Sequence, residues 1–123
     1  MKTLDLILGW LLVLVSLLHA VGSFAHYRGI PETLLWALSA TLAGLLLAAL
    51  NLLRVRRPDD RPLAWVSLGG CVGWLVIVFA FVRLIGNLLD VRVVIQGVVV
   101  LGLLAMCVRT LQCGSGLKTV RPL

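Results

Sequence analysis

The sequence has few charged residues and very few acidic ones. Asp and Glu together supply five of the 123 residues, and charged residues of both signs make up 13% of the chain. An ordinary soluble domain carries about 25%. No carboxylates are paired at membrane depth, no nucleophile stands beside a base, and no glycine loop suits a phosphate. The sequence therefore favours a protein without enzymatic activity over an enzyme.

Cysteines are also scarce. The chain has Cys71, Cys107 and Cys113, and no two of them have the C-x2-C spacing of a metal knuckle. The topology predicted below keeps all three away from an oxidising compartment, so no structural disulfide is expected. We interpret them as small apolar packing residues and predict no metal site.

Long apolar runs dominate what remains. The chain is 61% hydrophobic with a mean hydropathy of +1.10. Four stretches, 4–24, 33–53, 63–85 and 91–111, are each near the ~20 residues that a helix needs to cross ~30 Å of hydrocarbon. Short polar connections make successive helices antiparallel neighbours. The predicted fold class is all-α: one domain, 1–123, forming an antiparallel bundle of four transmembrane helices.

The positive charges predict an orientation. With the N-terminus in the cytoplasm, three basic residues lie outside, namely Arg28, Arg83 and Arg92. The other eight then lie inside: Lys2, Arg54, Arg56, Arg57, Arg61, Arg109, Lys118 and Arg121. This bias predicts that both termini are cytoplasmic. We expect a multi-pass protein of the bacterial cytoplasmic (inner) membrane, with the lipid bilayer as its surroundings. The net charge of +6 forms no patch on a folded domain, so a nucleic-acid partner is not expected.

Polar residues in the first span recur at helical spacing. This first-span stripe has steps of four and three and consists of Asp5, Gly9, Leu12, Ser16, His19, Ser23 and His26. Polar residues on one face of an apolar helix are expected to face protein or a cavity rather than lipid. Asp5, near the cytoplasmic end, is expected to be hydrated or paired with an arginine of that side.

Small residues mark packing faces on the next two spans. The second span has Ala37, Ala40, Gly44, Ala48 and Asn51 at steps of three and four. The third-span stripe consists of Gly69, Gly73, Val76, Ala80, Arg83 and Asn87. The G-x-x-x-G pair within this stripe allows two helix backbones to approach closely. We predict helix packing at Gly69, Gly73, Ala40 and Gly44.

The outer half of the bundle collects the remaining polar groups, which we predict to form a ligand-binding pocket. Its candidate residues are His19, Ser23, His26, Arg83, Asn87, Arg92 and Gln96. Glu32 or Asp90 would supply counter-charges. Two simpler interpretations stay open: Arg83 extends to the lipid headgroups, and the histidines and Ser23 only bridge helices, at about 0.6 kcal/mol per hydrogen bond.

The two histidines do not predict a cofactor. His19 and His26 lie about two turns, roughly 10 Å, apart along one helix, too far to share one metal ion. A haem would need an axial ligand from elsewhere, and the chain has no third histidine. Hydrogen bonding to a quinone is the other option. No cofactor is assigned.

The function expected from the sequence is a non-enzymatic integral membrane subunit or binding protein. It would assemble with itself or with a larger membrane complex, and its outer pocket would hold a lipid headgroup, a quinone or a small anion. The main alternative is a small transporter or channel formed by a homo-oligomer. A membrane redox protein, haem protein or enzyme that uses His19 or His26 is a third.

Overall fold

Four long helices make up the fold in a computed structural model that describes residues 1–87 and 89–113. They are α1 (Lys2–Tyr27), α2 (Pro31–Arg56), α3 (Arg61–Ile85) and α4 (Val91–Cys113), and the described residues contain no strand. Each helix is long and apolar enough to cross a membrane. Each helix also contains its predicted span and extends a few residues beyond it. The two exceptions are the end of α3 at residue 85 and the start of α4 at residue 91, which coincide with the predicted bounds. Lys118 and Arg121, counted in the charge bias, lie outside the described residues.

The helix ends follow from local sequence signals. Pro31 opens α2, where the missing backbone N–H costs nothing. Asp60 precedes α3 and accepts a hydrogen bond from the Leu63 backbone N–H at 3.0 Å. Asp90 does the same for the Arg92 N–H before α4, at 2.9 Å, because a short acidic side chain suits a helix N-cap. Gly86 ends α3 in the left-handed conformation, with φ of 71°.

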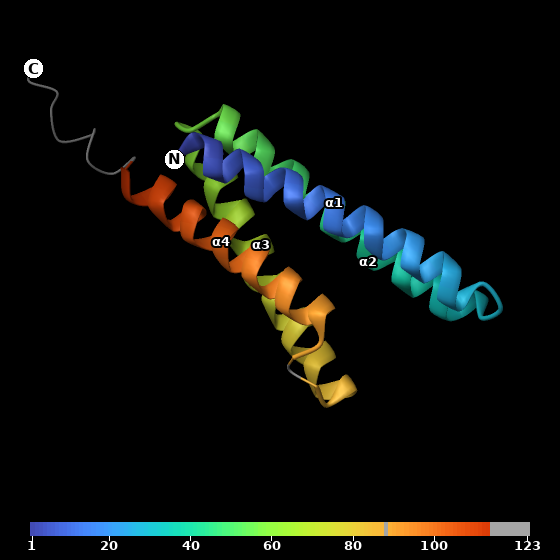
Figure 1. The fold of residues 1–123 in the computed structure, drawn as a ribbon. Coiled ribbons are helices and arrows are strands. Elements are labelled where there is room, and N and C mark those ends of the chain that lie inside the picture. Colours follow the sequence, from blue (N-terminus) through green and yellow to red (C-terminus); the bar gives the residue numbers. More distant parts are fainter. Residues whose placement is uncertain (88, 114–123) are drawn as a thin grey trace, which may run out of the picture.

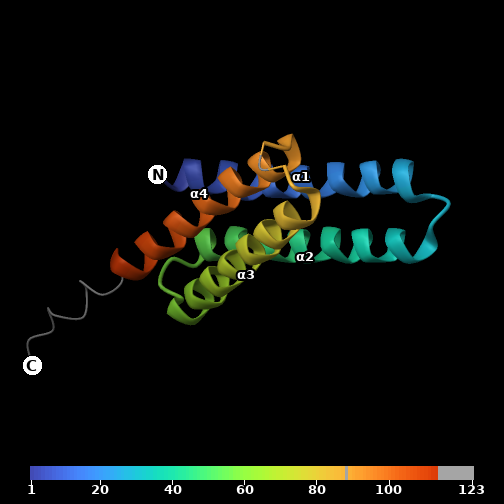
Figure 2. The same cartoon turned by 90° about the horizontal axis from the view of Figure 1, so that it is seen from below.

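The helices form two hairpins that meet at one end and diverge at the other. α1 packs along α2, and α3 packs along α4, while the hairpins contact each other through α1 with α4 and α2 with α3. In Figures 1 and 2 the hairpins lie together near the N-terminus and then run apart toward the α1–α2 and α3–α4 loops. We call the joined end the Arg54 end and the divergent end the Arg83 end.

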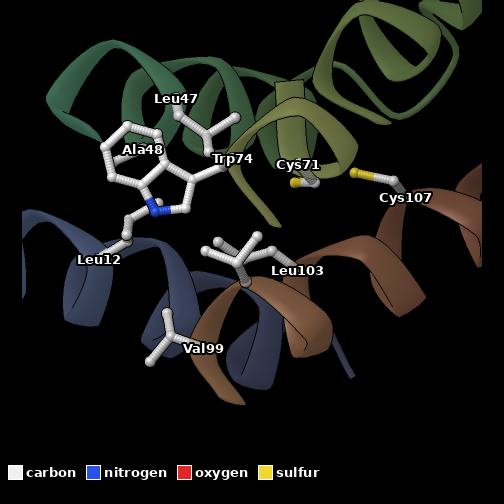
Figure 3. Packing of buried hydrophobic residues seen from close by; sticks show 9 residues of the cluster. Leu12, Leu47, Ala48, Cys71, Trp74, Val99, Leu103 and Cys107 are labelled. Carbon is white, nitrogen blue, oxygen red and sulfur yellow. The ribbon is translucent and has the colours of Figure 1, made fainter. Parts of the chain in front are cut away.

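An apolar core fills the region where the hairpins cross. Its buried members come from all four helices, and Figure 3 shows them around the Trp74 ring. They are Leu12, Leu47, Ala48, Cys71, Trp74, Val99, Val100, Leu103 and Cys107. The large aliphatic residues on the outer faces of the helices stay exposed, as expected for surfaces that face lipid.

The first-span stripe faces the protein over most of its length, as predicted. Asp5, Gly9, Leu12, Ser16 and Ser23 are buried. Gly44 of α2 allows the closest approach between α1 and α2, because a Cβ atom placed there would lie 2.5 Å from Ser16 Oγ. Gly44 therefore packs closely against α1 within the hairpin, and Ala40 beside it is half-buried.

Candidate functional site: a buried polar centre at the Arg54 end

The most unusual group in the structure is a buried ion pair. Arg54, near the end of α2, is 1% exposed, and its Nη2 atom donates to Asp5 Oδ1 of α1 at 2.6 Å. Charges removed from water need a close partner of opposite sign and further hydrogen bonds, since an unpaired buried charge is very costly. Asp5 is therefore paired with an arginine, which is one of the two options that the sequence allowed.

The rest of the Arg54 guanidinium joins α2 to α4. Nη1 donates to Thr110 Oγ1 at 2.7 Å and to the Met106 backbone oxygen at 3.2 Å. Nη2 also lies 3.5 Å from Asn51 Oδ1, one turn back on α2. Through this one side chain α1, α2 and α4 are held together at the Arg54 end.

Asn51 connects the ion pair to two thiols. Its Nδ2 atom donates to the Leu47 carbonyl at 2.9 Å and lies 3.7 Å from Cys71 Sγ on α3. Its Oδ1 atom accepts from the Cys107 thiol of α4 at 3.4 Å. Figure 3 shows the Cys107 sulfur pointing toward Cys71. Asn51 and both cysteines are 0% exposed, so the centre is a buried polar cluster within an apolar core.

Two donors of this region lack an acceptor among the described residues. They are Arg54 Nε and the hydroxyl of Ser67, which is 0% exposed and lies one turn before Cys71 on α3. A buried donor left without a partner costs about 1–3 kcal/mol. The centre therefore has spare capacity to stabilise negative charge.

A cavity of about 380 Å3 opens beside the ion pair at the Arg54 end. Its wall includes Lys2, Asp5, Arg54, Asp59 and Arg109, and it also includes three residues that carry sulfur. The cavity therefore opens directly beside the buried ion pair. A second cavity of about 300 Å3 lies between α3 and α4 at the same end, against Arg61 and Trp65.

The seven residues predicted to form an outer pocket occupy different environments. Ser23 is buried and donates to the His19 carbonyl of its own helix at 2.7 Å, while His19 itself is half-buried. Gln96 is half-buried and accepts from Trp74 Nε1 at 3.2 Å. The exposed members are His26, Arg83, Asn87 and Arg92.

The divergence of the hairpins explains why these residues do not gather within one chain. His19, Ser23 and His26 belong to one hairpin, and Arg83, Asn87, Arg92 and Gln96 belong to the other. Neither cavity described above is lined by any of the seven. Arg83 lies over the ring of Phe79, with its Cζ atom 5.6 Å from the ring centroid. The outer pocket stays a prediction.

The small-residue faces of α2 and α3 differ in their exposure. On α2, Gly44, Ala48 and Asn51 are buried within the chain. On α3, every residue of the third-span stripe is exposed, and a Cβ atom placed on Gly69 or Gly73 would meet no atom within 4 Å. The stripe is thus a face of mostly small and polar residues that is exposed along its whole length.

Sequence reasoning missed the centre because Arg54 resembled part of a solvated turn. The basic run at the end of the second span, with Arg54, Arg56 and Arg57, indicated a cytoplasmic loop. The available signal was spacing: Asn51 and Arg54 lie three residues apart on one helical face, which continues the small-residue face of the second span. That face is the buried one.

Comparison with protein-family models, with curated proteins and with solved structures finds no match. The site must therefore be interpreted from its own chemistry. Among residues 1–87 and 89–113, no three His, Cys, Asp or Glu side chains gather closely enough to form a metal site of that size.

Proposed function

We propose that this chain is an integral membrane subunit of the bacterial cytoplasmic membrane that assembles with a second copy of itself through the third-span stripe. All four helices cross the bilayer, and the Arg54 end faces the cytoplasm, in agreement with the distribution of basic residues. The observation that carries the proposal is that every residue of the stripe is exposed.

Small residues in a lipid-facing position indicate a site of helix association. Lipid tails are as apolar as leucine, so the hydrophobic effect does not bring membrane helices together. Association of membrane helices depends on close van der Waals packing, which small-xxx-small faces permit. Most of the exposed surface of α3 outside the stripe consists of large side chains, such as Trp65, Val72, Ile77 and Phe81. The flat face at Gly69 and Gly73 is where a second backbone can approach.

A symmetric pair of α3 helices would also give Arg83 and Asn87 a role. Helices that cross at a G-x-x-x-G site diverge at about 40°, so side chains far from the crossing point do not collide. Arg83 lies ten residues beyond Gly73, or about 15 Å along the helix. The two copies of Arg83 would then border a shared space near the headgroups. This space suits a lipid phosphate or another small anion, the ligand class expected from the sequence.

The assembly is tested with two matched glycine substitutions in nanodiscs. Gly73 and Gly22 are both exposed, and both lack any atom within 4 Å of an added Cβ. We expect native mass spectrometry to show dimers for the wild type and for Gly22→Leu, and monomers for Gly73→Leu with unchanged tryptophan emission. In the same spectra, Arg83→Ala should retain less phosphatidylglycerol. Monomeric wild-type protein, or an equal response of the two glycine variants, would contradict the proposal.

The transporter alternative has less support. A path along the first-span stripe would have to pass Leu12 and Ser16, which are 1% and 4% exposed and are packed against neighbouring helices. For an enzyme or a haem protein, no observation at His19 or His26 adds support beyond the sequence.

A further inference from the structure

All five sulfur-containing residues of the chain gather at or next to the Arg54 end. The sequence has two methionines and three cysteines. Met1, Met106 and Cys113 line the cavity beside the ion pair. Cys71 and Cys107 belong to the core cluster, joined through Asn51 to Arg54 in the wall of that cavity. Scattered packing residues have no reason to converge in this way.

Cys71 and Cys107 have the arrangement of a two-sulfur ligand set. They come from adjacent antiparallel helices, the Cys107 sulfur points toward Cys71 (Figure 3), the two thiols are close enough to interact, and the Asn51 amide contacts both. Both are free thiols. Thiolate and thioether ligands select soft ions such as Cu(I), whereas Zn²⁺ in a structural site needs four ligands. The described residues offer no third His, Cys, Asp or Glu at this point.

The surroundings suit the charge that such a site would carry. Two thiolates bound to one monovalent cation form a centre with one net negative charge. Arg54 lies next to this position, and its Nε atom, like the Ser67 hydroxyl, has a hydrogen to donate and no acceptor. These unpartnered buried donors are the second observation that points to a missing anionic group, beside the paired thiols themselves.

We propose that Cys71 and Cys107 bind one soft monovalent metal ion, of the Cu(I) and Ag(I) class, which enters through the sulfur-lined cavity. Binding breaks two S–H bonds and forms two metal–sulfur bonds. The two protons leave to water in the cavity, and no electron is transferred. Met106 supplies a weaker soft ligand along the entry, and it directly precedes Cys107 in the chain.

The test uses Ag(I) as the probe, with the full chain in nanodiscs and a soluble thiol as competitor. Native mass spectrometry should show one retained Ag(I) per chain in the wild type and in Cys113→Ser. Cys71→Ala and Cys107→Ala should each lower the apparent affinity by at least about 100-fold, because each removes one of the two ligands. Cys113→Ser is the matched control, since it removes a cysteine of the same end that lies outside the pair.

A second measurement keeps the proposal falsifiable if an alanine variant fails to fold. X-ray absorption of Cys113→Ser loaded with Cu(I) should show two sulfur neighbours and no nitrogen or oxygen neighbour. The proposal is overturned if no ion is retained, if retention follows Cys113 alone, or if the bound ion has ligands other than two sulfurs.

Discussion

The two ends of this molecule differ in how their polar side chains are buried and paired. At the Arg54 end, the polar side chains of Asp5, Asn51 and Arg54 are buried and hydrogen-bonded between helices. At the Arg83 end, the polar side chains Arg83, Asn87, Arg92 and His26 are exposed, and the hairpins that carry them run apart. The same kinds of residue thus hold one end of a single chain together and leave the other available to partners.

The contrast is tested most strongly by replacing one arginine at each end. Arg54→Met leaves the Asp5 carboxylate buried without its cation, so we expect a loss of about 3–5 kcal/mol in the free energy of unfolding. Arg83→Met removes only an exposed charge over Phe79 and should leave the unfolding midpoint of the single chain unchanged. Both values come from unfolding in mixed micelles followed by tryptophan emission.

A double substitution separates the ion pair from general damage at that end. Asp5→Leu combined with Arg54→Met replaces both charges by apolar groups and should recover most of the lost stability, because no unpaired charge remains. Equal stabilities of Arg54→Met and Arg83→Met would show that the two ends do not differ in the way the structure indicates.

A smaller effect is expected where the apolar core gives way to the Arg83 end. Gln96→Leu removes the acceptor of the Trp74 N–H bond, which is 3.2 Å long in the structure. The expected cost is about 0.6 kcal/mol, the average for hydrogen bonds between membrane helices. The emission of Trp74 should also shift to the blue, measured with the other three tryptophans replaced by phenylalanine. Ser39→Ala is the control, because the exposed Ser39 hydroxyl donates to the Leu35 carbonyl of its own helix. An equal loss of stability in Ser39→Ala and Gln96→Leu would contradict this interpretation.

The helices were predictable from the sequence because they depend on local chemistry. Apolar run length located all four, and Pro31 and Asp90 are residue types that favour helix starts. The spacing of the first-span stripe identified the buried face of α1, and the small residues of the second span identified the buried face of α2. The self-bonding of Ser39 and Thr41 to carbonyls of their own helix also follows from residue type.

What the sequence did not give is the angle between the hairpins. Short loops make sequential helices neighbours but do not determine whether two hairpins lie parallel or diverge. That angle depends on contacts between residues distant in sequence, such as Arg54 with Thr110 and Asn51 with Cys107. A parallel bundle would have brought His19 near Arg83. In the divergent arrangement the enclosed polar site lies instead at Arg54, Asn51 and the two buried thiols.

The central claim is that the hairpins are joined at the Arg54 end and open at the Arg83 end, and distances between spin labels test it most directly. One pair of labels, on Gly29→Cys and Asn87→Cys with Cys113→Ser, joins the two loops of the Arg83 end. The other, on Arg57→Cys and the native Cys113, spans the Arg54 end. Unlabelled wild-type protein in excess ensures that each assembly holds at most one labelled chain. The account predicts that the distance between the labels at 29 and 87 is clearly longer than the distance between the labels at 57 and 113. Loops separated by one interhelical spacing, about 8–10 Å, would mean a closed bundle and would contradict it.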